Sequence, residues 1–329
     1  RQATGDPGPR TRGTVMMRMF ALSVTGILAA ATVTASALYR RILRVAEPTC
    51  GMLPNGLAYA RVGTGAKSLL FLRGLPGVPF GRLQMMLSVL FMGPLLESGY
   101  TMWVIARQRG MPEGHTVADM ADDLAALIDD RFDGKVDLVI GEEAAGGMTA
   151  FCLAANHPER FGHLAVLLAG HRMSEEGRDF EREFARLLSV DRRDEAGSLL
   201  VRTIAPGLPV LGDSRLLGAV LTRFLLEEPY PSLAQDVVVE AEAVTAFDGS
   251  AVLPKIRVPV LLIGCDGDFE VPREVYEETA RLIPDCTFRL YEGKTAFQAG
   301  SDKRLPVDVL DFVEQHPEAE TGERASAMT

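Results

Sequence analysis

Short apolar runs alternate with longer amphipathic stretches along the middle of the chain. Short runs bounded by turn residues are typical of strands that are buried on both faces, and the stretches between them have the period of helices. The apolar runs cover residues 68–72, 102–106, 136–140, 164–168, 258–263 and 287–290. The alternation predicts an α/β fold, with a mostly parallel sheet covered by helices on both faces.

One of these helices has a clear start signal. Thr116 is followed three residues later by Asp119, which is the spacing of a capping box at the N-terminus of a helix. The apolar positions that follow keep the helical period to about residue 130. We therefore expect a helix over residues 116–130.

The alternation breaks off between residues 172 and 252. Helical stretches follow one another there without a strand among them, over residues 177–188, 195–204, 215–226 and 233–247. Helices inserted between two strands of a sheet predict a cap over the edge of the core. The predicted core then has a first part at 50–171 and a second part at 253–315, with the cap at 172–252.

The N-terminal region has a different composition. Residues 19–39 form an uncharged, largely apolar run between Arg18 and Arg40, which is long enough to span a bilayer as a helix. The sequence Ala35-Ser36-Ala37 also fits the cleavage site of a signal peptide. We expect a membrane-associated protein with a single N-terminal anchor, or an exported one.

Composition and charge limit the classes of function that the chain can have. The chain has 329 residues, of which 47% are hydrophobic, and its formal net charge is −10. This charge excludes binding to nucleic acid through a basic face. The basic residues 1–18 and the tail at 316–329 are expected to be disordered. Nothing in the spacing of the four cysteines indicates a metal site or a disulfide framework, and no glycine motif for a nucleotide cofactor is present.

Five pieces occur in an order that resembles a known family. They are the strand end Phe71-Leu72-Arg73-Gly74-Leu75-Pro76-Gly77, the segment 103–110, a strand–turn–helix at 136–156, the sequence His157-Pro158-Glu159-Arg160, and the strand and turn at 259–268. Together they resemble the α/β-hydrolase superfamily over about residues 55–315. The resemblance implies an eight-stranded sheet whose strand ends carry a nucleophile, an acid and a histidine beneath a cap.

The nucleophile of this family stands on a sharp turn after a strand, in a G-x-S-x-G elbow. The turn here is Gly141-Glu142-Glu143-Ala144-Ala145-Gly146-Gly147. Counting from the helix side places the nucleophile at Ala144, which has no atom that can attack a carbonyl. Counting from the strand side places it at Glu143, whose carboxylate is an alternative nucleophile. A structural interpretation is that the two glutamates lie at the positive end of the next helix.

The acid position of the family is retained, whereas the histidine position is not. Asp268 lies in a G-x-x-x-D-x-x-x-P pattern that matches the acid of the family, or else it bonds the backbone of its own turn. Ala296, or Thr295, stands where the resemblance implies the histidine. His171 is expected at the catalytic edge of the sheet, and Glu270 at the surface.

The resemblance also implies an oxyanion hole made of two backbone N–H groups. They would come from Ala145, after the elbow, and from Leu75, in the loop after the third strand. Pro76 has no N–H to donate. Arg73 either reinforces this anion-binding concavity or pairs with an acidic residue.

These substitutions lead to three hypotheses. The first is a catalytically degenerate α/β-hydrolase fold that binds an apolar small molecule or a protein partner under its cap. The alternative is an active, esterase-like hydrolase with a non-standard nucleophile such as Glu143 and with His171 as its base. The third is an interaction protein whose pocket is filled by side chains. We expect neither a cofactor nor a metal in any of the three.

Overall fold

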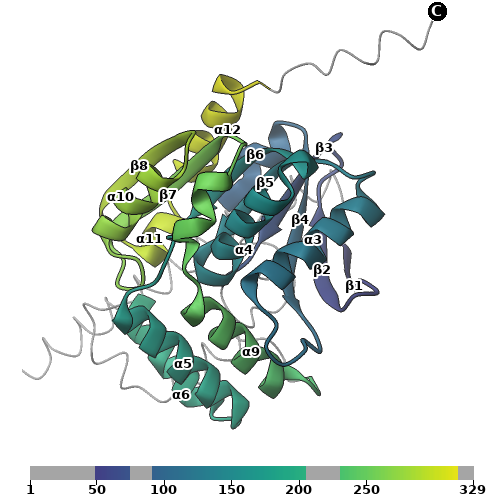
Figure 1. Ribbon diagram of the computed structural model, residues 1–329. Coiled ribbons are helices and arrows are strands. Elements are labelled where there is room, and N and C mark those ends of the chain that lie inside the picture. Colours follow the sequence, from purple (N-terminus) through teal and green to yellow (C-terminus); the bar gives the residue numbers. More distant parts are fainter. Residues whose placement is uncertain (1–48, 75–90, 205–229, 318–329) are drawn as a thin grey trace, which may run out of the picture.

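The computed structural model describes residues 49–74, 91–204 and 230–317, which form one eight-stranded sheet with helices on both faces (Figure 1). The strand order is β1-β2-β4-β3-β5-β6-β7-β8. The strands are β1 (Thr49–Met52), β2 (Leu57–Val62), β3 (Lys67–Leu72), β4 (Tyr100–Gln108), β5 (Val136–Glu142), β6 (Phe161–Leu167), β7 (Val260–Gly267) and β8 (Cys286–Thr295). The predicted fold class is confirmed.

The sheet is parallel from β4 to β8, and its two first strands form an antiparallel edge. All six predicted apolar runs lie in the parallel part. The sequence pattern missed β1 and β2. Every residue of β1 is exposed, so this strand has no apolar run from which to recognise it.

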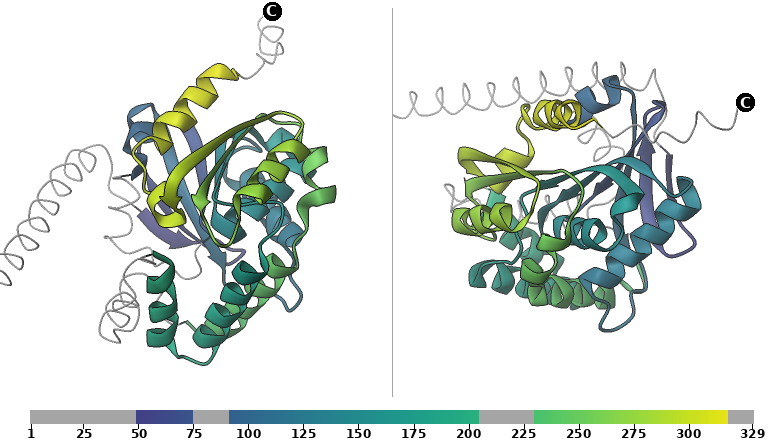
Figure 2. Two further views of the ribbon diagram at one scale, coloured as in Figure 1. Left: turned by 90° about the vertical axis from the view of Figure 1, so that its left-hand side faces the viewer. Right: turned by 45° about the horizontal axis from the view of Figure 1, so that its top comes forward.

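Helices cover the two faces of the sheet with two separate apolar cores. On one face lie α3 (Val117–Arg131), α4 (Glu143–Asn156) and α10 (Arg273–Leu282), and on the other lies α12 (Leu305–Gln315) (Figure 2). A short helix, α11 (Ala296–Gly300), follows β8. Single 3-10 turns complete the connections, at η1 (Pro158–Arg160), η2 (Gly249–Ala251) and η3 (Leu253–Lys255).

The start of α3 is the capping box that the sequence predicts. The Asp119 N–H donates to Oγ1 of Thr116 over 3.2 Å, and the Thr116 N–H donates back to the Asp119 carboxylate over 2.8 Å. Two backbone N–H groups of the first turn are satisfied in this way. The helix begins within one residue of the expected position.

Three helices form a separate layer at the edge where the parallel strands end (Figure 1). They are α5 (Glu175–Ser189), α6 (Arg193–Ile204) and α9 (Leu233–Ala246), and they share a small apolar core of their own that includes Phe184, Leu188 and Val237. They correspond to three of the predicted cap helices. The fourth, at 215–226, lies outside the described residues, as do the predicted membrane segment at 19–39 and most of the tail. Within the described part of the chain, no helix has the length and apolarity needed to cross a bilayer.

Candidate active site

The turn between β5 and α4 has strained backbone geometry at a single residue. Glu143, the first residue of α4, has a φ of 56°, in the left-handed region that favours glycine. Small residues allow the turn to pack against β3. A Cβ on Gly146 would lie 2.2 Å from the Leu72 carbonyl oxygen, and one on Gly74 would lie 2.7 Å from Cβ of Glu143.

The positive φ favours one of the two ways of counting the elbow. It falls on Glu143 and not on Ala144, so the backbone follows the count from the strand side. The count from the helix side gives Ala144 because it matches Gly146-Gly147 to the two glycines that follow the nucleophile in the family. With Glu143 at the nucleophile position, Ala145 stands at the first of these glycine positions. Ala144 and Ala145 are both buried within the first turn of α4.

Arg73 lies beside the elbow and faces Glu142. Its Nε is 3.8 Å from Oε2 of Glu142, and both atoms are buried without a hydrogen-bond partner among the described residues. Burial raises the pKa of Glu142, while the positive charge of Arg73 lowers it. The sequence left two expectations for Arg73, and the contact that the structure shows is the second one, an ion pair with an acidic residue. Leu75, the expected oxyanion donor, lies outside the described residues.

The carboxyl group of Glu143 lies among four other carboxyl groups, those of Glu142, Glu181, Asp268 and Glu270. Burial raises the pKa of Glu143 well above its ordinary value of 4.5, and the charges of Glu142, Glu181 and Asp268 raise it further. The pKa of Glu270 is raised well above 4.5 by burial and by the charges of Glu181, Asp268 and Glu143. Since like charges repel, ionisation of one carboxyl group in this cluster disfavours ionisation of the others.

The cap closes over this cluster through the first turns of α5. Ser174 donates its backbone N–H to the Glu270 carbonyl over 2.8 Å and its hydroxyl to the Phe269 carbonyl over 2.7 Å. A Cβ on Gly177 would lie 2.8 Å from Cα of Glu270, so the helix rests directly on the loop after β7. Glu270 was expected at the surface, but this contact makes it partly buried.

Glu181 is a member of the cluster that the sequence analysis missed. It lies one helical turn after Gly177 and is buried, with 7% of its surface exposed. It also falls on the apolar stripe of α5, between Gly177 and Phe184. A glutamate at a core-facing position of an amphipathic helix is a signal that the sequence contained.

Asp268 uses both carboxylate oxygens within its own neighbourhood. Oδ1 accepts from the backbone N–H groups of Glu270, over 2.9 Å, and Val271, over 3.2 Å. Oδ2 accepts from the hydroxyl of Tyr276 over 2.5 Å. Burial raises the pKa of this carboxyl, and these hydrogen bonds partly offset the rise. The geometry is that of a residue that bonds its own turn.

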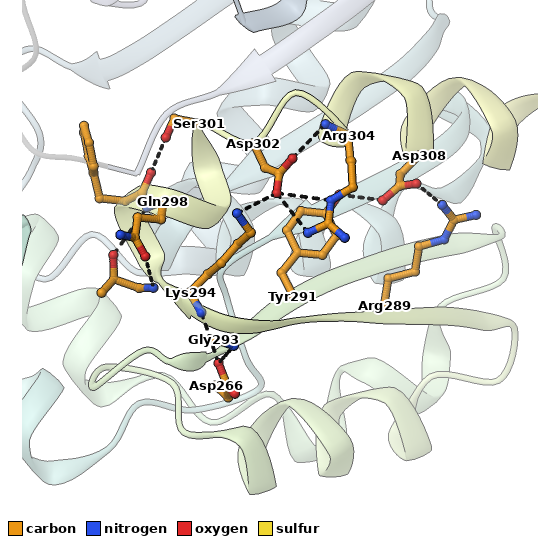
Figure 3. A network of polar contacts seen from close by, with 12 residues as sticks. Asp266, Arg289, Tyr291, Gly293, Lys294, Gln298, Ser301, Asp302, Arg304 and Asp308 are labelled. Atoms are coloured by element: carbon orange, nitrogen blue, oxygen red, sulfur yellow. Dashed lines mark hydrogen bonds and ion pairs between the residues drawn. The ribbon is translucent and has the colours of Figure 1, made fainter.

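The histidine position of the family carries a well-formed helix start instead. Thr295 accepts from the Gln298 N–H and caps α11, whose first residue is Ala296. A polar network fixes this region against α12 (Figure 3). Asp302 pairs with Lys294 and Arg304, both at 2.9 Å. These contacts hold the loop after β8 without any titratable side chain at the expected position.

His171 is almost fully buried and is bonded to α10. Its Nδ1 is 2.9 Å from Oγ1 of Thr279, and its Nε2 is 3.5 Å from the Glu278 carboxylate. Burial lowers its pKa. Among the described residues it makes no hydrogen bond or ion pair with Glu143, so the structure does not bring the two together as a nucleophile and base.

The described residues show no metal-binding cluster. No group of three histidines, cysteines or acidic residues among them is arranged to hold a metal ion.

Solved structures with this architecture come from several hydrolases. A hydrolase from Pseudomonas aeruginosa PA01 superposes with a TM-score of 0.65, covering 81% of this chain and 98% of that one at 18% identity. The enol-lactonase of Burkholderia xenovorans LB400 gives 0.60 at 18% identity, covering 78% and 96%. The chain has the α/β-hydrolase fold.

One curated protein is also similar to this chain in its amino-acid sequence. A putative carbamate hydrolase, RutD, from Caulobacter sp. (strain K31), is 26% identical over 211 residues, which cover 62% of this chain and 75% of that protein. No family model matches the chain.

Proposed function

We propose that this protein is a hydrolase of small acyl compounds, such as esters, in which the Glu143 carboxylate attacks the carbonyl carbon. The observation that carries the proposal is the positive φ of Glu143 at the turn between β5 and α4. A long side chain in this conformation costs about 1 kcal/mol or more relative to glycine, and such strain is retained chiefly at functional sites.

The proposed reaction proceeds through an acyl-enzyme. The ionised carboxylate of Glu143 attacks the ester carbonyl, the carbon–oxygen bond to the alcohol breaks, and a mixed anhydride forms. The leaving alkoxide takes a proton from the carboxyl group of Glu270, the acidic residue of the loop after β7 whose pKa is raised by burial and by its neighbours. Water then cleaves the anhydride, which releases the acid, regenerates the Glu143 carboxylate and returns a proton to Glu270. An anhydride is more reactive than a serine ester, so this step depends less on a histidine base.

The backbone N–H of Ala144 is the donor that this geometry offers to the developing oxyanion. It belongs to the residue directly after Glu143, the relation that the family uses. The N–H of Ala145, expected from the other way of counting, is one residue further along. The names of the structural relatives, an enol-lactonase among them, support an acyl substrate.

The test compares p-nitrophenyl acetate and butyrate hydrolysis by the full chain and by Glu143→Gln. We expect the variant to lose turnover, and hydroxylamine added to the wild type to trap the anhydride as a hydroxamate at Glu143, seen by peptide mass spectrometry. Glu183→Gln, at an exposed position on α5, is the matched control and should retain full activity. Equal turnover in wild type and Glu143→Gln would refute the proposal.

A second candidate is a catalytically degenerate protein that binds an apolar small molecule or a partner under the cap. Two observations favour it: Thr295 and Ala296 stand at the histidine position, and Asp268 is bonded to its own turn and to Tyr276. A folded wild type without turnover toward any acyl substrate, and without a trapped adduct, is the result expected from this candidate.

A further inference from the structure

The chain enters and leaves the cap along two segments that lie side by side. His171 stands just before the cap helices, and Gly249 follows α9, the last of them. The Gly249 N–H donates to the His171 carbonyl over 2.7 Å, which joins the two segments. A Cβ on Gly249 would lie 2.7 Å from Cδ1 of Leu253 and 3.2 Å from the same carbonyl oxygen, so the segments are closely packed. We call residues 170–174 and 247–249 the stem of the cap.

The side chain of His171 attaches this stem to the core helix α10. Thr279 of α10 is fully buried and donates its hydroxyl to the Val275 carbonyl over 2.6 Å. Its oxygen therefore accepts from the two groups that face it, the backbone N–H and Nδ1 of His171, both at 2.9 Å. On the other side of the ring, Nε of Arg172 lies 3.1 Å from Nε2 of His171 and is only a donor. These hydrogen bonds fix a neutral ring, with its proton on Nδ1.

Charged groups from the stem and from α10 act on this ring. The carboxylate of Glu278 on α10 lies 3.5 Å from Nε2, and Asp248 belongs to the stem; both negative charges favour a protonated ring. Burial and the positive charge of Arg172 disfavour it. Only 1% of the surface of His171 is exposed, and burial is the largest of these effects, so the pKa of His171 is lowered.

A second proton on the ring conflicts with these contacts. Nε2 would become a donor, so the hydrogen bond from Arg172 would be lost and two positive charges would face one another. If the stem separates from α10, the ring enters water and regains its ordinary pKa of about 6.5. The attached stem is therefore fully favoured above about pH 6.5, and it loses stability as the pH falls below this value, because the separated stem binds the proton more tightly.

We propose that His171 is a pH-sensitive latch of the cap, whose neutral ring holds the stem on α10 and whose protonation releases it. The stem includes Ser174, which donates its N–H and its hydroxyl to carbonyl groups of the loop after β7. Release of the stem therefore loosens the cap over the elbow in acid. The latch does not depend on the reaction proposed for Glu143, and it is tested without turnover.

Hydrogen exchange of the full chain, followed by mass spectrometry at pH 7.5 and pH 5.5, measures the release. Each rate is divided by the intrinsic rate at that pH. We expect protection of the Ser174 and Gly249 amides to fall by up to about tenfold between the two values, the most that a ring with an open-state pKa of about 6.5 provides. Protection of β5 should not fall with it, which distinguishes local release from unfolding of the sheet.

His171→Asn keeps a side-chain donor and does not titrate, so it should lose this pH response. His157→Asn is the matched control, because His157 pairs with Asp122 of α3 and lies outside the cap; it should respond like the wild type. The carboxyl groups beside the elbow, whose pKa values are raised, respond to pH in the opposite direction. The wild type and His171→Asn are therefore compared at each pH.

Two substitutions leave the ring in place and change only its charged neighbours. Glu278→Gln removes a negative charge that favours the protonated ring, so the loss of protection in acid should be larger than in the wild type. Arg172→Gln removes the opposing positive charge and the hydrogen bond to Nε2, so the loss should be smaller. These two variants test the latch even if thermal unfolding shows that His171→Asn does not fold. An equal pH response in the wild type and a folded His171→Asn, an equal response in Glu278→Gln and Arg172→Gln, or a parallel loss of protection in β5 overturns the proposal.

Discussion

Glu143 combines a strained backbone with a carboxyl group that is held among other carboxyl groups. Both features oppose folding, because the left-handed conformation disfavours a side chain and because burial and like charges disfavour ionisation. A turn with a purely structural role would be served better by glycine. The cost is intelligible if the side chain takes part in the reaction.

Replacing Glu143 by glycine tests whether the positive φ strains the folded protein. Glu143→Gly should raise the free energy of unfolding by about 1 kcal/mol, after allowing for the greater entropy of glycine in the unfolded chain, and should abolish esterase turnover. Urea unfolding and p-nitrophenyl butyrate hydrolysis are the two measurements.

The matched control for this change is Asp133→Gly. Asp133 also has a positive φ, of 52°, but it is exposed in the loop after α3. Its replacement should stabilise the protein slightly, since aspartate tolerates this conformation better than glutamate, and should leave turnover unchanged. A destabilised Glu143→Gly would contradict the assignment of strain to the elbow.

Among the elements, α9 is the cap helix whose attachment to the core is best defined. Asp236 is fully buried and accepts from the backbone N–H groups of Gly110, over 3.0 Å, and Met111, over 2.9 Å. The hydroxyl of Ser232 donates to the same carboxylate over 2.8 Å. One side chain of the cap thereby accepts hydrogen bonds from two backbone N–H groups of the loop that follows β4.

Removing this carboxylate leaves the Met111 N–H without its acceptor, and leaves the Gly110 N–H with only Oγ of Ser232, at 3.1 Å. We expect Asp236→Ala to lower the free energy of unfolding by about 2–4 kcal/mol, measured by urea denaturation. Asp179→Ala, at an exposed position on α5, should change it by less than about 0.5 kcal/mol. Equal effects of the two substitutions would show that α9 is not anchored through Asp236.

The elements differ in how far the sequence predicts them. The parallel strands and α3 follow from apolar runs and a capping box, because buried strands and helix starts leave local signals. The elbow register does not follow, because counting residues cannot reveal which one has positive φ. The acidic cluster does not follow either, since Glu143 and Glu181 meet only after the cap has closed over the sheet.

At the scale of the whole molecule, we expect the carboxyl cluster to couple stability and the proposed activity to pH in opposite directions. Glu143 and Glu270 have folded-state pKa values well above the ordinary 4.5, so the folded protein binds their protons more tightly than the unfolded chain does. Their contribution to stability is fully present below about pH 4.5 and is lost as the pH rises through the folded values. Attack by Glu143, in contrast, needs its ionised form.

We therefore expect the melting temperature to fall, and kcat/KM for p-nitrophenyl butyrate to rise, as the pH increases from 4.5 toward the raised pKa of Glu143. In Glu270→Gln the decline in melting temperature should be shallower, because one titrating group has been removed. Scanning fluorimetry across a pH series, beside initial rates, measures both. Parallel changes in stability and rate would contradict the proposed role of an ionised Glu143.

The position of the cap in the chain also affects how the protein is made. The cap separates β6, which ends at Leu167, from its neighbour β7, which starts at Val260. At about 5–20 residues per second, a ribosome needs on the order of 5–20 s to supply the missing strand. Throughout that interval the apolar β6 is an unpaired edge, open to pairing with other nascent chains. We therefore expect this protein to be most prone to aggregation at this stage of its synthesis.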